Sequence, residues 1–499
     1  MAVAGCTSGR SSGDDASSPA VATELAPPQT LARTGVGGGT LLLASDDREL
    51  RRSMEAMNDL GVNLLRLDIP WPLVEPARGV WNWAPVDRVV DSAERHGIEV
   101  VGIIDYTPTW DSKQGDQFSQ RPSSPAAYGR YAGQVARHFG GRVTTYEIWN
   151  EPNGGFFFRP GPDPEFYTRM LRSAYRAIKS ASPRSVVLGG SVATAVDSDT
   201  TMNGLTFLER VYAAGGGPFM DAVSIHPYSY PQSYAFDPGN PVSAMRMAAD
   251  MYDVMRRHGD GGKRIWATEV GFPASGASST DERRQADLLV SSVREWSQLS
   301  FAGPIMIHEL RDRAEAAGDR ENTFGLIDFD FSRKSAFTAL KALVADGVDD
   351  DTTYRRIVAA ASASSVDLGG RVTPWYRDVS SRGVPSIRQE FVNGDVICTG
   401  GECFASPGPV MELLDKQGHL PAGAFENGHQ KVGAVVQTEV FYSPRTGAHL
   451  LSGDMLGAWR PEYGLPMSDE RSDSSGTVVR CERATLRVSR GGTVRVESA

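Results

Sequence analysis

Apolar, strand-like segments alternate with segments of helical periodicity along about 310 residues of this chain, from Thr34 to Ala345. The strand-like segments are Leu41–Ala44, Asn63–Leu67, Glu99–Ile104, Thr144–Trp149, Val186–Leu188, Asp221–His226, Arg264–Val270 and Pro304–His308. Parallel strands need a helical crossover between them, so the alternation predicts a parallel sheet covered by helices. Eight such units over this length predict an α/β fold, a closed (β/α)8 TIM barrel.

An open, doubly wound sheet is the alternative fold for the same alternation. Such a sheet commonly binds a nucleotide at a glycine-rich loop that follows a strand. No GxGxxG or P-loop motif follows any of the predicted strands. The barrel is therefore the favoured fold.

The regular pattern stops after Leu343. Residues 346–382 are rich in Asp, Ala, Ser and Thr, which indicates a linker or an irregular extension. From residue 383 to 499, short strand-like runs are separated by Gly, Pro and Asn, which predicts a smaller β-rich domain. With a polar, disordered tether over residues 1–33, the barrel is expected to occupy residues 34–345.

The composition excludes several classes of protein. The chain carries 51 Lys and Arg against 61 Asp and Glu, a net charge of −10, and no basic stripe that would bind nucleic acid. No apolar run approaches the ~20 residues of a membrane span, and the four cysteines lack zinc-binding spacing. We expect no metal and no cofactor. Cys398 and Cys403 are close enough for a local bridge, with a pairing of Cys403 and Cys481 left open.

Two glutamates lie at the ends of predicted strands. Glu151 follows one strand in the motif Trp-Asn-Glu-Pro, and Glu269 lies near the end of another in Thr-Glu-Val-Gly-Phe. The carboxyl ends of barrel strands open to one mouth, where barrel enzymes carry out their chemistry. Paired carboxylates suit glycoside hydrolysis, in which one protonates the leaving oxygen and the other attacks the anomeric carbon.

These two motifs resemble those of the clan A retaining glycoside hydrolases, with similarity to family 39-like and family 5-like members over residues 31–345. The resemblance implies that Glu151 is the acid/base and Glu269 the nucleophile of a double displacement. It implies carboxyl groups ~5–5.5 Å apart rather than ~9 Å. It also implies substrate-binding roles for Asn150, Arg66, His226 and Tyr228. The resemblance further implies that Arg66 keeps the nucleophile Glu269 ionised.

Other side chains near the predicted mouth are weaker candidates. Trp110 is expected to contact a sugar ring with its face. Glu309 is a third and less favoured carboxylate. Asp68 and Asp105 also end predicted strands, and we expect them to form supporting hydrogen bonds or to cap helices rather than to take part directly in the chemistry.

Two further segments resemble parts of exported bacterial proteins. Residues 3–6, Val-Ala-Gly-Cys, resemble a lipoprotein lipobox, which implies lipidation of Cys6. Residues 441–470 resemble an LGFP repeat of actinobacterial envelope proteins, which implies that the C-terminal module binds a cell-wall polymer. Both imply export to a bacterial, and specifically an actinobacterial, cell envelope, with membrane contact only through a lipid anchor.

The function expected from the sequence is cleavage of a poly- or oligosaccharide by a retaining glycosidase. The alternative is a catalytically inactive carbohydrate-binding or scaffold protein of the cell wall. The presence of both glutamates with Asn150 and Arg66 favours the enzyme, since a binding protein does not need the full set.

Overall fold

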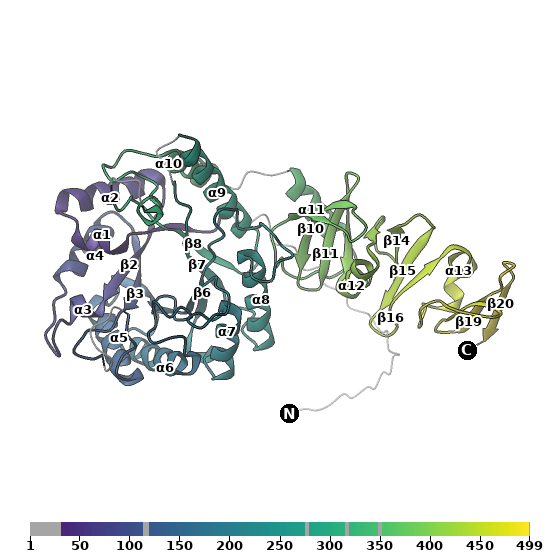
Figure 1. The fold of residues 1–499 in the computed structure, drawn as a ribbon, viewed down its shortest axis with the longest axis horizontal. Coiled ribbons are helices and arrows are strands. Elements are labelled where there is room, and N and C mark those ends of the chain that lie inside the picture. Colours follow the sequence, from purple (N-terminus) through teal and green to yellow (C-terminus); the bar gives the residue numbers. More distant parts are fainter. Residues whose placement is uncertain (1–30, 113–118, 275–278, 315–318, 348–351, 499) are drawn as a thin grey trace, which may run out of the picture.

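The computed structural model of the chain describes residues 31–112, 119–274, 279–314, 319–347 and 352–498. Its N-terminal part is a closed barrel of eight parallel strands, in which β1 pairs with both β2 and β8 (Figure 1). The strands are β1 (Thr34–Gly37), β2 (Leu64–Pro70), β3 (Glu99–Asp105), β4 (Val143–Ile148), β5 (Val186–Ala193), β6 (Ala222–His226), β7 (Ile265–Val270) and β8 (Ala302–Ile307). The predicted TIM barrel is confirmed. Cys6 lies outside the described residues.

Helices surround the barrel (Figure 1). The longer ones are α2 (Asp47–Leu60), α4 (Ala84–Arg95), α5 (Pro125–Phe139), α6 (Pro164–Ala181), α7 (Gly204–Ala213), α8 (Ala244–Arg257), α9 (Ser279–Ser297) and α10 (Ser335–Asp346). Short helical segments are α1 (Gly39–Ala44), α3 (Trp71–Val74), η1 (Gly217–Phe219) and η2 (Arg320–Asn322). In α2, the Asp46 carboxylate accepts from the Glu49 backbone N–H while the Glu49 side chain accepts from the Asp46 backbone N–H, so this helix begins with a capping box.

The first barrel strand differs from the prediction. Leu41–Ala44, expected to be that strand, lies in the helix α1, and β1 instead covers Thr34–Gly37. A Cβ atom on Gly35 would lie 2.6 Å from the carbonyl oxygen of Leu64, so the barrel wall leaves no room for a side chain there. Because β1 is half glycine, it lacks the branched and aromatic residues that mark a strand in a sequence.

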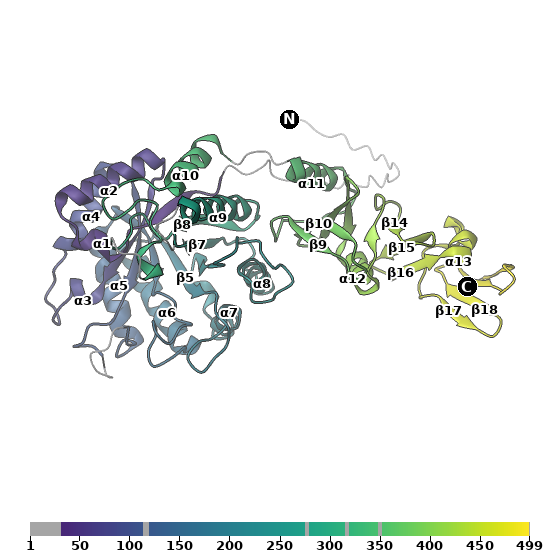
Figure 2. The ribbon, with the colours of Figure 1, turned by 45° about the horizontal axis from the view of Figure 1, so that its top comes forward.

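Three four-stranded antiparallel sheets follow the barrel (Figure 2). Their strand orders are β12-β11-β10-β9, β13-β14-β15-β16 and β17-β18-β19-β20. The strands are β9 (Tyr376–Val379), β10 (Pro385–Phe391), β11 (Gly394–Thr399), β12 (Glu402–Pro407), β13 (Leu420–Pro421), β14 (His429–Gly433), β15 (Thr438–Ser443), β16 (Gly447–Ser452), β17 (Arg471–Asp473), β18 (Gly476–Arg480), β19 (Ala484–Val488) and β20 (Val494–Ser498). Helices α12 (Gly408–Gln417) and α13 (Gly453–Ala458) and the turn η3 (Pro461–Tyr463) connect them. The predicted β-rich region is confirmed.

The segment 346–382 is more regular than the expected linker. It contains the helix α11 (Thr352–Ala363) and the strand β9. Ile357 and Ala361 of α11 pack into the core of the first sheet, against residues such as Phe391. The apolar face of α11 is narrow and consists partly of alanine, so only its burial against the sheet distinguishes it from a polar connection.

Polar contacts join the first sheet to the barrel. Arg246 of α8 donates two hydrogen bonds to the Glu390 carboxylate of β10, at 2.8 and 2.6 Å. Within this sheet, Cys398 and Cys403 face each other across the β11–β12 hairpin and form a disulfide. Cys481, which follows β18, is buried and free. Among the described residues, no helix has both the length and the apolar character needed to cross a membrane.

Candidate active site

A cavity of about 1050 Å³ opens at the carboxyl ends of the barrel strands. Its polar and charged lining residues come from several strand ends: Arg66, Asp68, Asp105, Asn150, Glu151, Glu269, His308 and Arg313. Aromatic rings complete much of its wall: Tyr106, Phe157, Tyr228, Tyr230 and Phe324. This is where a barrel presents functional side chains, and an apolar wall with convergent polar groups is typical of a ligand site.

Glu151 reaches the cavity because the chain turns sharply after β4. Trp149 and Glu151 have φ angles of 69° and 43°, in the left-handed region that residues other than glycine rarely adopt. The Glu151 N–H donates to the Ser191 carbonyl oxygen at 3.0 Å, and the Gly154 N–H donates to the Glu151 carbonyl oxygen at 2.9 Å. Such backbone strain persists only where the surroundings hold it, and here it presents the Glu151 carboxylate at the mouth.

Glu269, on β7, is held by donors on both carboxylate oxygens. Arg66 Nη1 donates to Oε1, and the Tyr228 hydroxyl donates to Oε2 at 2.9 Å. Burial alone would raise the pKa of Glu269, but the positive charges of His226 and Arg66 hold it well below its usual range. An ionised carboxylate in this position is suited to attack an electrophilic carbon.

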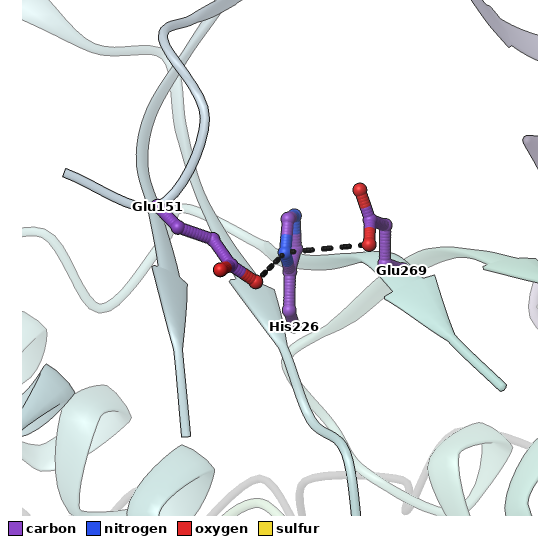
Figure 3. A group of neighbouring side chains, drawn as sticks. All are labelled: Glu151, His226 and Glu269. Atoms are coloured by element: carbon purple, nitrogen blue, oxygen red, sulfur yellow. Dashed lines mark hydrogen bonds and ion pairs between the residues drawn. The ribbon is translucent and has the colours of Figure 1, made fainter. Parts of the chain in front are cut away.

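His226 lies between the two glutamates (Figure 3). Its Nδ1 is 2.8 Å from Glu151 Oε1 and 3.7 Å from Glu269 Oε2. Burial would lower the pKa of His226, but the carboxylates of Glu269 and Glu151 raise it above its usual value. A proton is therefore held close to Glu151, at the hydrogen bond between the two side chains.

The spacing of these groups is short. The facing atoms of Glu151, His226 and Glu269 all lie within 4.8 Å of one another. The facing oxygens of the two glutamates therefore lie close enough to reach one small group placed between them. The same three side chains could hold a metal ion, but Arg66 and Tyr228 already donate to Glu269, and a cation would have to replace them.

The position of Arg66 is fixed by a residue that the sequence does not single out. Arg66 Nε donates to Glu147 Oε2 at 2.7 Å, and Nη2 donates to Asn150 Oδ1 at 3.0 Å. Glu147 is completely buried in β4 and also accepts from the Thr268 hydroxyl at 2.7 Å. Burial would raise the pKa of Glu147, but Arg66 lowers it. In the sequence, the available signal for Glu147 is its position two residues before the end of the predicted strand Thr144–Trp149, and it belongs to no motif.

His308, directly after β8, is a second residue that the sequence does not single out. Arg313 Nη2 lies 3.1 Å from His308 Nε2, and an arginine can only donate, so Nε2 is the acceptor and the ring proton is on Nδ1. That Nδ1 lies 3.7 Å from Glu269 Oε2. Burial lowers the pKa of His308 to about 4, so the ring is a neutral donor at neutral pH. Glu309 points to Arg313, whose Nε donates to its Oε1 at 2.8 Å.

The structure does not bring Trp110 into the cavity. Its indole N–H donates to the Glu75 carbonyl oxygen at 2.8 Å, and its ring packs edge-on against Trp71, with centroids 5.7 Å apart. The side chain therefore helps to hold the loop after β3, and the aromatic rings that line the cavity belong to other residues. Glu309 does not line the cavity either. The other residues predicted for the site line it or, in the case of His226, contact both glutamates.

A parallel barrel with two glutamates facing each other at its mouth defines a glycosidase. The sequence profile described as Cellulase (glycosyl hydrolase family 5) matches residues 36–300. The chain belongs to this family. No curated protein sequence matches the chain.

Solved structures share the fold at low sequence identity. A family 39 glycoside hydrolase from Bacteroides cellulosilyticus WH2 aligns with a TM-score of 0.53 and 19% identity, covering 75% of this chain and 71% of that one. A monomeric β-xylosidase from Caulobacter crescentus CB15 aligns with a TM-score of 0.50 and 17% identity, covering 74% and 73%. These similarities show that the two enzymes share the barrel fold of this chain.

Proposed function

We propose that this chain is a retaining glycoside hydrolase that cleaves O-glycosidic bonds of a poly- or oligosaccharide by double displacement. One observation carries the proposal. Glu269 accepts from Arg66 and Tyr228 and is kept ionised by the charges of His226 and Arg66, and Glu151 faces it at short range in contact with His226. Such an arrangement suits a nucleophile and an acid/base that act on one glycosidic bond.

In the first step, Glu269 attacks the anomeric carbon while the bond from that carbon to the leaving oxygen breaks. Glu151 gives its proton to that oxygen, and the sugar is left as an ester of Glu269. In the second step, a water molecule gives a proton to Glu151 and attacks the anomeric carbon, which releases Glu269. We expect Asn150, whose Oδ1 accepts from Arg66, to bind a sugar hydroxyl beside the reacting carbon.

The test uses aryl glycosides and a polysaccharide panel with the wild type and two single variants. Glu269→Gln keeps the shape of the side chain but cannot attack, and we expect kcat to fall at least ~10⁴-fold. For Glu151→Gln, kcat/KM should fall much less on substrates with an activated leaving group, because the first step then needs no proton, whereas hydrolysis of the sugar ester should remain slow without the base. The anomeric configuration of the first product, followed by NMR, should be that of the substrate. Inversion, or full activity of Glu269→Gln, would contradict the proposal.

The second candidate function is a carbohydrate-binding protein without activity. The wall of aromatic rings around the cavity is compatible with binding alone. Product release distinguishes the two functions. If the wild type binds an oligosaccharide in calorimetry but releases no product from any member of the panel, the chain is a binding protein.

We also propose that the enzyme acts at the cell envelope. The support is the lipobox-like segment before Cys6 and the LGFP-like sequence over residues 441–470, within a β-rich C-terminal region. In a bacterial host the full chain is expected in the membrane fraction, and Cys6→Ser should release it. The C-terminal region is expected to make the purified chain sediment with isolated cell walls. A chain that stays soluble with and without Cys6, and that does not sediment with walls, would contradict this location.

A further inference from the structure

Two aspartates lie in the cavity beside the catalytic pair and have no role in the double displacement. Arg66 and Asp68 are two residues apart on β2, so both side chains point to the same face, into the barrel mouth. Asp105, the last residue of the neighbouring strand β3, has Pro70 as its register partner on β2 and also lines the cavity. The two carboxyl groups thus meet at the wall next to the nucleophile's arginine.

These two carboxyl groups form few other polar contacts. Asp105 is only 1% exposed, and neither of its oxygens accepts a hydrogen bond from an N–H or O–H donor. Its carboxyl group instead lies beside that of Asp68, and two such acceptors can share a hydrogen bond only with a proton on one of them. Burial, followed by the charge of Asp68, raises the pKa of Asp105 well above its usual range, so Asp105 holds that proton. Asp68 is then the acceptor.

Both aspartates line the cavity, and Asp68 is the less buried of the two. A carboxylate that already accepts one hydrogen bond still has lone pairs for two more donors. Two adjacent hydroxyl groups on a sugar ring offer two such donors at the spacing of the two carboxylate oxygens. The remaining lone pairs of Asp68 therefore gain hydrogen bonds when a ligand supplies these donors.

We propose that Asp68, supported by protonated Asp105, is a recognition site for a pair of adjacent free hydroxyl groups on the sugar next to the cleaved bond. This inference rests on the proposed function and adds a substrate class to it: glycosides in which that sugar carries neither an ether nor an ester at these hydroxyls. Asp105 is a positioning residue, because it acts on the sugar through Asp68.

The experiment measures the affinity of oligosaccharides by calorimetry in a Glu269→Gln background, where binding does not depend on turnover. Asp68→Asn should weaken binding ~10–100-fold, the value of a hydrogen bond to a charged group. Asp105→Asn should stay within ~3-fold, because the Asn amide N–H can donate to Asp68 in place of the shared proton. The matched control is Glu321→Gln at the cavity rim, where the carboxylate already pairs with Arg320 at 3.4 Å; its affinity should not change.

A second arm needs no variant at the pair. An oligosaccharide with the two hydroxyls of one ring methylated should lose affinity for the protein by at least ~10-fold, and Asp68→Asn should remove this discrimination. Equal binding of methylated and free sugars, or equal losses in Asp68→Asn and Glu321→Gln, would overturn the proposal. Hydrolysis without an effect of Asp68 would overturn this inference alone. Failure of the wild type both to bind and to hydrolyse any sugar would overturn the proposed function with it.

Discussion

At the scale of single residues, Arg66 organises the site. Its three nitrogens donate to Glu147, Asn150 and Glu269, and each bond has a different consequence. The bond to Glu147 fixes the guanidinium, the bond to Glu269 keeps that carboxylate ionised, and the bond to Asn150 orients its amide. A buried arginine whose charge is compensated by two carboxylates is rigid, and rigidity of this kind is what preorganised catalysis requires.

Tyr228→Phe removes the hydroxyl that donates to Glu269 and leaves the ring in place. Hydrogen bonds to charged groups contribute about 1.5–3 kcal/mol, so kcat/KM should fall ~10–100-fold. The control is Tyr175→Phe, which removes a hydrogen bond to Asp221 at 3.3 Å outside the cavity and should leave kcat/KM unchanged. Steady-state kinetics on one aryl glycoside check both variants, and equal rates for Tyr228→Phe and the wild type would contradict this role of the hydroxyl.

Glu309 gives the fold a pH dependence of known sign. Burial raises the pKa of Glu309 from 4.5 to about 7, so its ionisation is harder in the folded than in the unfolded state. The stability that neutral Glu309 contributes is present at low pH and is lost as the pH rises towards 7. Between pH 5 and 8 the wild type should lose about 2 kcal/mol of unfolding free energy relative to Glu309→Gln. Urea unfolding at both pH values measures this, and parallel pH profiles would refute it.

At the scale of elements, the ends of β4 and β7 matter more than their middles. Glu151 depends on a left-handed turn, and Glu269 depends on a close approach of the chain at Gly271. A Cβ atom on Gly271 would overlap the carbonyl oxygen of His308 and lie 2.7 Å from the Phe324 ring. Two strand ends can approach this closely only where one of them lacks a side chain.

Gly271→Ala should therefore move the end of β7 away from His308. We expect a loss of about 1–3 kcal/mol of stability, as for other overpacked sites, and at least a tenfold lower kcat from the displaced Glu269. Gly262→Ala, in the loop before the same strand, is the matched control, because its Cβ atom would have nothing within 4 Å. Thermal unfolding and kinetics distinguish them; an unchanged Gly271→Ala enzyme would show that the contact is easily relieved.

At the scale of the whole molecule, the β-rich region is joined to the barrel on the side of α8. The Arg246–Glu390 pair is largely buried, with 22% and 17% of the two side chains exposed. Tyr376 of β9 also donates to Glu390 and belongs to the barrel's hydrophobic core. The first sheet is therefore part of the same packed unit as the barrel.

A double-mutant cycle on Arg246→Ala and Glu390→Ala measures this connection. We expect a coupling free energy of about 1–3 kcal/mol, because two charge-assisted hydrogen bonds are lost together. The exposed pair of Arg210 and Glu165, 47% exposed on each side, should give at most about 0.5 kcal/mol. Denaturant titrations of the four proteins in each cycle provide the values. Equal coupling in both cycles would mean that the interface adds nothing beyond a surface ion pair.

The sequence by itself determined the barrel and the two glutamates. Seven of its eight strands carry enough branched apolar residues to be recognised, and a motif places each glutamate at a strand end. The exception is β1, whose glycines are explained only by the packing of Leu64 against it. The helix α11 likewise becomes distinct only when its few apolar residues meet the first sheet.

Only the tertiary structure determines which polar groups lie together at the mouth of the barrel. Glu147 on β4 and His308 after β8 lie far apart in sequence, and no local pattern distinguishes them from other polar residues. Asp68 and Asp105 end predicted strands, but only the closed barrel shows that they lie side by side. Barrel closure brings their strand ends together, and the low polarity of the interior then makes each proton and hydrogen bond significant. The local pattern of apolar residues is sufficient to predict helices and strands, because it reflects which face of each is buried. The active site depends on distances between side chains of different strands, and only the closed barrel sets these distances.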